Sequence, residues 1–219
     1  MQSSCGVVRQ DRDMSMQIDL RKIRCQCISM KKSTSRRENI ARLMKRLEFD
    51  RWDFFDGVED EDHVLGCAKS HISALTKHDF REPLLLLEDD VDITPDYTNT
   101  FSVPDNTDAL YLGYSWWAWD KERASMSKLD NETVIEKEEN YYRVSNMTST
   151  HAILYLTKSY ADSVVNAIEN YLVDESGNRH CDVAIAKMQK NHNVIAAPKH
   201  YFFQMCPRNT YWTNRSILV

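Results

Sequence analysis

The sequence predicts a single α/β domain with a largely parallel central sheet. Apolar segments of strand length alternate with segments of helical periodicity along most of the chain, and this order of elements is typical of α/β proteins. The four leucines at residues 84–87 form a continuous apolar run, as expected of a strand that is buried on both faces. Because the chain has neither an internal repeat nor a linker rich in Pro, Gly or Ser, we expect one folded unit.

The composition argues against several classes of protein. The 219 residues are 42% hydrophobic and 28% charged, with a formal net charge of −5, so we expect neither a nucleic-acid partner nor an anionic membrane partner. No apolar run reaches the length of a membrane span and residues 1–30 lack the core of a signal peptide, which predicts a cytoplasmic protein without a membrane span. The six cysteines include no C-x-x-C pair, so free thiols are expected rather than a zinc site or a disulfide framework.

The N-terminal part is expected to contain an arm, a strand and an amphipathic helix. Residues 1–21 have no apolar period and are predicted to be a mobile arm, so that the domain covers residues 22–219. Residues 23–30 are the first expected strand. Ser35 and Glu38 match a capping box at the beginning of a helix. Four apolar residues follow at helical spacing: Ile40, Leu43, Met44 and Leu47.

Basic side chains at the beginning of this helix are candidates for binding a phosphate. Lys31, Lys32, Arg36 and Arg37 lie before or within its first turn, where the helix dipole favours acidic groups. A phosphate or diphosphate that docks at the helix N-terminus would explain them. A solvated basic surface explains the same residues equally well.

The middle of the chain is expected to contain a strand, a helix and the leucine strand. Residues 51–55 are predicted to form a strand that ends in a turn at Asp56 and Gly57. Residues 66–80 have helical periodicity. His71 lies within that helix, and such a histidine more often packs or caps than binds a ligand.

The second half of the chain continues the alternation of strands and helices. The expected strands are residues 108–113, 141–144, 152–156 and 193–197, and the expected helices are residues 159–172 and a short helix that begins near Asp182. Residues 120–140 are highly charged and predict a flexible loop, which could serve as a lid. The aromatic segment at residues 114–119 is expected to cover the core or, alternatively, to offer flat faces to a sugar.

The most informative segment is the acidic sequence that ends the leucine strand. Glu88, Asp89 and Asp90 follow Leu87 directly. Side chains alternate along a strand, so Glu88 and Asp90 are expected on one side and Asp89 on the other. Two carboxylates that face the same way repel each other, and a hard divalent cation with substrate phosphates would relieve this repulsion. A solvated acidic turn is the alternative interpretation.

Three motifs, in this order, resemble glycosyltransferase family 25, which includes lipopolysaccharide-type and procollagen-type galactosyltransferases. The motifs are the basic segment Ser35–Ile40 with Asp56-Gly57 downstream, then Gly66-Cys67-x-x-Ser70-His71, and then Leu86–Val91. The similarity covers roughly residues 28–92, and a weaker similarity covers residues 149–197. The family usually has Asn-Leu after the first strand, whereas this chain has Ser29-Met30.

The resemblance implies a GT-A-like fold, a nucleotide-binding α/β sandwich with a mostly parallel central sheet. It implies that Glu88 and Asp90 hold Mn²⁺ or Mg²⁺ against the donor diphosphate, with His200 as a further metal ligand. It also implies an inverting reaction in which Asp182 is the general base. The residues implied to contact the donor are Arg36, Arg37, Asp56, Gly57, Ser70, His71 and Asp89.

The function implied is transfer of a sugar from a nucleotide-sugar donor, with a UDP-sugar expected, to a hydroxyl of a glycan or glycoprotein acceptor. Two other classes of function stay open. A non-catalytic binding domain could share the fold, since a fold does not determine a function. A metal-dependent phosphohydrolase would also use acidic residues at the end of a strand, although it normally needs more ligands than this motif supplies.

Overall fold

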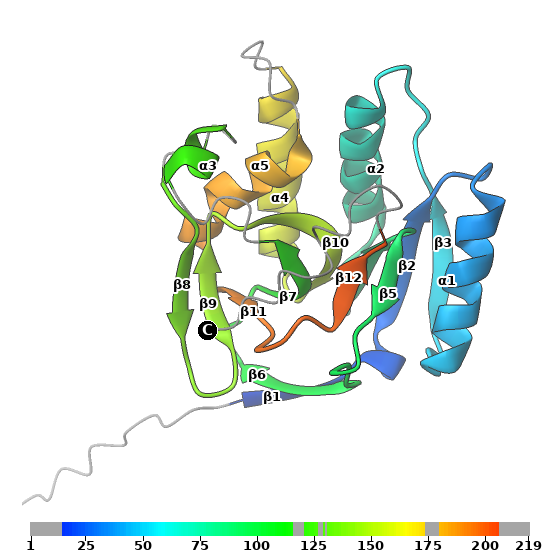
Figure 1. The fold of residues 1–219 in the computed structure, drawn as a ribbon, viewed down its shortest axis with the longest axis horizontal. Coiled ribbons are helices and arrows are strands. Elements are labelled where there is room, and N and C mark those ends of the chain that lie inside the picture. Colours follow the sequence, from blue (N-terminus) through cyan, green and yellow to red (C-terminus); the bar gives the residue numbers. More distant parts are fainter. Residues whose placement is uncertain (1–14, 116–120, 127–128, 130, 174–179, 206–219) are drawn as a thin grey trace, which may run out of the picture.

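The computed structural model describes residues 15–115, 121–126, 129, 131–173 and 180–205. Its centre is a sheet of eight strands in the order β3-β2-β4-β10-β7-β11-β9-β8 (Figure 1). The strands of this sheet are β2 (Arg24–Ser29), β3 (Trp52–Asp56), β4 (Leu84–Glu88), β7 (Ala109–Ser115), β8 (Val134–Lys137), β9 (Tyr142–Ser145), β10 (Thr148–Tyr155) and β11 (Val194–Ala196). The helices are α1 (Thr34–Arg46), α2 (His63–Lys77), α3 (Lys121–Met126), α4 (Lys158–Leu172) and α5 (Cys181–Met188), with 3₁₀ turns at Leu20–Lys22 and Gln189–Asn191.

Two short antiparallel ribbons complete the described structure. The first pairs β1 (Ser15–Asp19) with β6 (Thr100–Pro104). The second pairs β5 (Val91–Ile93) with β12 (Phe202–Gln204), so that β12 lies beside the segment that follows the acidic residues.

The alternation of the leucine strand divides the interior into two layers. Leu84 and Leu86 pack on one face of the sheet with α2, α4 and α5, whereas Leu85 and Leu87 pack on the other face with α1 and the two ribbons. All four leucines are almost fully buried. The predicted strand, buried on both faces, is therefore confirmed, and so is the α/β sandwich.

The central sheet is mixed. Parallel pairs join β2 to β3, β2 to β4 and β7 to β11. The long strand β10 lies antiparallel between β4 and β7, and β9 and β8 also pair in the antiparallel sense. The parallel pairing therefore occurs in two separate regions rather than across the whole sheet.

Some expected boundaries differ from the structure. Residues 15–21, which were assigned to the arm, form β1 and enter the first 3₁₀ turn, and Ile18 and Leu20 are buried. The folded region therefore includes residues before 22, because alternating apolar side chains cover one edge of the core. Residues 1–14 lie outside the described part.

Two local predictions are wrong. Helix α1 begins after Ser33, not Ser35, and the side chain of Ser33 makes no capping hydrogen bond. The predicted loop at residues 120–140 contains α3 and β8, and β8 pairs with β9. Short amphipathic edge segments such as β8 have too few apolar residues to be recognised from their sequence.

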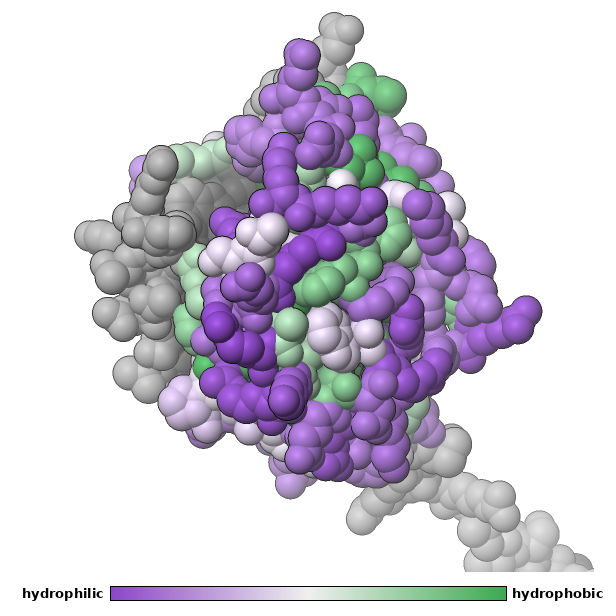
Figure 2. All heavy atoms as spheres, turned by 90° about the vertical axis from the view of Figure 1, so that its right-hand side faces the viewer, coloured by the Kyte–Doolittle hydropathy of each residue, from purple (hydrophilic) through white to green (hydrophobic). Residues whose placement is uncertain are grey.

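The surface on the side of α1 and β3 is mostly hydrophilic, with a hydrophobic strip near its centre (Figure 2). Strand β3 is the edge of the sheet on this side, and residues 52–55 are half-buried. Among the described residues, none of the helices has the length and apolar character needed to cross a membrane.

Candidate functional site

The candidate site is built where β2 and β4 end. Because the two strands are parallel neighbours, Ser29 at the end of β2 and the acidic residues after Leu87 come to the same edge of the sheet. Asp89 accepts hydrogen bonds from the Ser29 hydroxyl (2.7 Å) and from Nη1 of Arg36 (2.8 Å). Asp89 is therefore a buried anchor between β2 and α1, which is a structural role.

Glu88 points to the other side and is held by three donors. Its Oε1 accepts a hydrogen bond from the Thr150 hydroxyl (2.5 Å) and lies 3.3 Å from Nε2 of His71, while its Oε2 accepts from Nε2 of Gln204 (3.1 Å). Burial alone would raise the pKa of Glu88, but the hydrogen bond and charge of His71 outweigh it and lower this pKa to about 2. Glu88 is thus ionised in the neutral range and lies on the α2 side of the sheet, opposite Asp89, as the alternation predicted. The alternation does not extend to Asp90, because β4 ends at Glu88, residues 89–90 form a turn, and Arg36 approaches both Asp89 and Asp90.

Asp90 differs from Glu88 and Asp89 because its carboxylate is buried but only partly paired with hydrogen-bond donors or cations. Nη1 of Arg36 lies 3.9 Å from its Oδ2, and its Oδ1 is buried with no hydrogen-bond partner among the described residues. Burial, followed by the charge of Glu88, raises the pKa of Asp90 to about 6. A buried acceptor oxygen beside an ionised carboxylate is suited to a positively charged ligand.

These residues fit a hard divalent cation in part. Carboxylate oxygens are ligands of Mg²⁺ and Mn²⁺, and the free Oδ1 of Asp90 is the position at which such an ion would gain the most. Both oxygens of Glu88 already accept hydrogen bonds, so Glu88 is better placed to fix the charge of the site than to supply a vacant ligand atom.

The two arginines of α1 have different partners. Arg36 contacts Asp89 and approaches Asp90. Arg37 donates to the Ser29 carbonyl (2.7 Å) and to Oδ1 of Asp56 (2.7 Å), and its guanidinium lies 4.7 Å from the centre of the Phe54 ring. Arg37 therefore joins the ends of β2 and β3, whereas Arg36 reaches the acidic residues.

Gly57 and Ser70 shape the loop after β3. Ser70 accepts a hydrogen bond from the Val58 amide (2.8 Å) and donates to the Gly66 carbonyl (2.6 Å), so it attaches this loop to α2. A Cβ atom at Gly57 would lie 2.8 Å from Sδ of Met30. Gly57 acts here through its lack of a side chain and Ser70 through its hydroxyl group, which bonds to the backbone of the loop and of α2.

Asp182 lies in the first turn of α5. Its Oδ1 accepts a hydrogen bond from the Val183 amide (2.9 Å). Burial raises its pKa, and Glu88 is among the charges that raise it further. The structure therefore brings Asp182 to the α2 side of the acidic residues, where Glu88 lies.

In the described part of the chain, His200 contacts Tyr114 rather than the acidic residues. Its ring packs on Tyr114, with 3.9 Å between the ring centres, and its Nε2 is buried without a hydrogen-bond partner among the residues that the structure describes. Burial lowers its pKa to about 4, and the neighbour whose charge adds to this is His151. No hydrogen bond or ion pair in the described part joins His200 to Glu88 or Asp90.

The sequence did not indicate several residues of the site. Thr150 and Gln204, which hold Glu88, come from β10 and β12. The polar triplet at residues 149–151 within an otherwise apolar strand was a detectable signal, because buried polar residues need partners. Gln204 carried no such signal. Of the aromatic segment 114–119, residues 116–119 lie outside the described part, and Tyr114 is buried with its hydroxyl donating to the Ala197 carbonyl (2.9 Å).

Cysteines extend the site on the α2 side. The thiols of Cys67 and Cys181 interact, which lowers the pKa of Cys67 to about 5 and raises that of Cys181. Burial alone would lower the pKa of His71, but hydrogen bonds with Cys67 and Glu88 raise it to about 10. Cys67, His71 and Glu88 therefore form one connected set of polar groups.

The fold and this site define an α/β protein with an anionic site at the carboxyl ends of parallel strands, where ligands bind in open α/β sheets. No protein-family model matches the chain, and no curated protein matches it in sequence.

Two solved structures are similar at low identity. One is a glycosyltransferase involved in the glycosylation of the major capsid of PBCV-1, with a TM-score of 0.48 and 13% identity over 86% of this chain and 94% of the other. The second is the nucleoside-diphosphate-sugar pyrophosphorylase from Vibrio cholerae RC9, with a TM-score of 0.41 and 12% identity over 82% of this chain and 75% of the other. Likenesses of this size transfer no activity, so the function must be argued from the site.

Proposed function

We propose that this chain is a metal-dependent glycosyltransferase of the GT-A type. It would move a sugar from a nucleotide-diphosphate donor, with a UDP-sugar expected, to a hydroxyl of a glycan or glycoprotein. The observation that carries this proposal is the buried Oδ1 of Asp90, which has no hydrogen-bond partner in the described part of the chain and lies beside the ionised Glu88 at the end of β4. The motifs that resemble glycosyltransferase family 25 support it and add the substrate class.

The donor diphosphate would lie between the acidic residues and α1. Asp90 would hold Mn²⁺ or Mg²⁺, and Arg36, which is half-exposed, would contact the diphosphate from the side of α1. Such a cation neutralises the negative charge that builds up on a departing nucleoside diphosphate. Arg36 lies between Asp89 and Asp90 and can shift toward a phosphate without leaving its anchor at Asp89.

Asp182 is the proposed general base. In an inverting transfer, the acceptor oxygen forms a bond to the anomeric carbon while the bond to the diphosphate oxygen breaks, and the hydroxyl proton goes to a carboxylate. The raised pKa of Asp182 makes it a stronger base than an exposed aspartate. Its position on α5 also separates it from Arg36, which lies on α1.

Turnover of nucleotide sugars tests the proposal. A panel of UDP- and GDP-sugars is incubated with the chain, with and without Mn²⁺, and release of nucleoside diphosphate is compared with sugar transfer to glycan acceptors. We expect metal-dependent release with at least one donor and loss of this activity in Asp90→Asn. Asp92→Asn is the matched control, because Asp92 lies two residues away and pairs with the exposed Arg46. Donor binding without turnover would favour the binding-domain alternative, and metal-dependent hydrolysis of phosphate esters would favour the hydrolase.

A further inference from the structure

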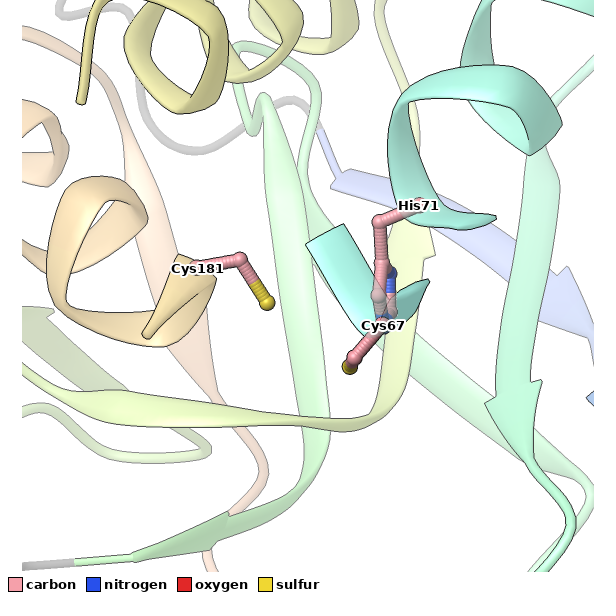
Figure 3. Close-up of side chains that lie close together, drawn as sticks. All are labelled: Cys67, His71 and Cys181. Carbon is pink, nitrogen blue, oxygen red and sulfur yellow. The ribbon is translucent and has the colours of Figure 1, made fainter. Parts of the chain in front are cut away.

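Two cysteines and a histidine form a cluster between α2 and α5. Cys67 and His71 are one helical turn apart on α2, and Cys181 is the first residue of α5. Their side chains point into the space between the two helices (Figure 3). The two sulfur atoms and one ring nitrogen of His71 all lie within 4.8 Å of one another. Neither thiol has a role in the sugar transfer proposed above.

We propose that Cys67, His71 and Cys181 bind a zinc-type divalent ion. Two thiolates and an imidazole are ligands that Zn²⁺ prefers, with Zn–S bonds of about 2.3 Å and Zn–N bonds of about 2.0 Å in a tetrahedral arrangement. Two ligand atoms on one such ion lie about 3.5–3.8 Å apart. The ligand atoms here, within 4.8 Å of one another, therefore need to approach by no more than about 1.3 Å, which side-chain rotation supplies.

The surroundings of the cluster suit a bound cation. Oε1 of Glu88 lies 3.3 Å from Nε2 of His71, so a carboxylate is present beside the ligands and can orient the imidazole. The two thiolates alone balance the charge of a divalent ion, and this carboxylate adds a further negative charge beside it. Cys67 is exposed, whereas Cys181 and His71 are buried, so the ion has a route from solvent to a site closed on its inner side.

This site is distinct from the cation site proposed at Asp90. Thiolate and imidazole ligands select Zn²⁺, whereas carboxylates suit Mg²⁺ and Mn²⁺. The sequence predicted no zinc site, because Cys67 and His71 supply only two ligands and Cys181 lies 114 residues further along the chain. A bound ion would tie α2 to the beginning of α5 and so fix the helix that carries Asp182.

Cobalt binding tests the site independently of activity. The reduced full chain, stripped of metal with a chelator, is titrated with Co²⁺ and then with Zn²⁺. We expect one equivalent of Co²⁺ to produce thiolate-to-cobalt charge-transfer absorption and the visible bands of a tetrahedral ion, and Zn²⁺ to displace it. Cys67→Ser and Cys181→Ala should each weaken Co²⁺ binding about tenfold or more and remove a large part of the charge-transfer absorption.

Matched variants separate this site from the other features of the chain. Cys25→Ala removes a buried thiol from β2 and should leave the Co²⁺ spectrum unchanged, and so should Asp90→Asn, even if the glycosyltransferase proposal fails. Because Cys67 is exposed, Cys67→Ser is expected to fold. The proposal is overturned if the reduced chain takes up no Co²⁺, or if Cys67→Ser binds it as tightly as Cys25→Ala. A Cys67–Cys181 disulfide in the unreduced chain, with no Co²⁺ uptake after reduction, would also overturn it.

Discussion

Replacing Asp90 by Asn is expected to stabilise the metal-free chain. The pKa of Asp90 is raised from 3.8 to about 6 by burial and by Glu88, so its ionised form is disfavoured in the folded state. Each pKa unit corresponds to about 1.4 kcal/mol. The ionised carboxylate therefore costs about 2–3 kcal/mol of unfolding free energy at neutral pH, and the nearly isosteric amide removes this cost.

The pH dependence of this effect has a definite sign. A carboxyl whose folded pKa is raised is protonated in both states below about pH 4, so it carries no penalty there. The penalty grows as the pH rises from about 4 to about 6, where only the unfolded chain releases the proton easily, and it is complete above the folded pKa. The difference between wild type and Asp90→Asn should therefore be small at about pH 4 and full at about pH 7 and above.

Urea denaturation with a chelator present measures the effect at both pH values. A gain of about 2–3 kcal/mol corresponds to an increase in Tm of about 4–12 °C for a domain of this size. Asp89→Asn is a control in which the opposite change is expected. Asp89 accepts hydrogen bonds from Ser29 and Arg36, so loss of its carboxylate should lower the free energy of unfolding by about 1–3 kcal/mol. Destabilisation of Asp90→Asn at neutral pH, or an equal gain at both pH values, would refute the reasoning.

Three further predictions follow from the same contacts. Arg36→Ala should weaken nucleotide-sugar binding and lessen the salt dependence of that binding in isothermal titration. Arg37→Ala should mainly lower the Tm, because Arg37 joins the ends of two strands. Equal losses of affinity in the two variants would contradict this difference. Asp182→Asn should slow sugar transfer about 100-fold or more with donor affinity unchanged, and near-normal initial rates would exclude it as the base. Gly113→Ala should lower the unfolding free energy by about 3 kcal/mol or more, because the added Cβ would lie 2.1 Å from Nε2 of His151. An unchanged urea denaturation curve would contradict this prediction and show that the strand shifts to accommodate the methyl group.

The elements with a strong period could be predicted from the sequence. The leucine strand, α1, α2 and α4 each bury several apolar residues on one face or on both, and the structure places them within a few residues of the expected bounds. The ribbon strands β5 and β12 could not be predicted. Each has three residues, and their pairing depends on contacts between segments more than 100 residues apart.

The acidic residues could be found from the sequence, but their separate roles could not. Glu88, Asp89 and Asp90 all carry a carboxylate, so their residue types do not distinguish their roles. The alternation of a strand predicts only the direction in which each side chain points. The structure distinguishes them by partners: Thr150 and Gln204 hold Glu88, Arg36 holds Asp89, and one oxygen of Asp90 has none among the described residues. Partners that come from distant strands leave no local pattern in the sequence.

The attachment of β12 to the acidic segment has a consequence for the order in which the protein is made. Gln204 contacts Glu88, and the Met205 amide donates to the Asp90 carbonyl (2.6 Å). A ribosome completes the acidic segment more than 100 residues before it adds Gln204 and Met205, so a nascent chain first carries Glu88 and Asp90 without these two contacts. We therefore expect the newly made chain to acquire a finished site only after β12 leaves the ribosome. Chains stalled before residue 202 would retain the leucine core but present a loosely held acidic loop, which limited proteolysis of stalled chains could detect.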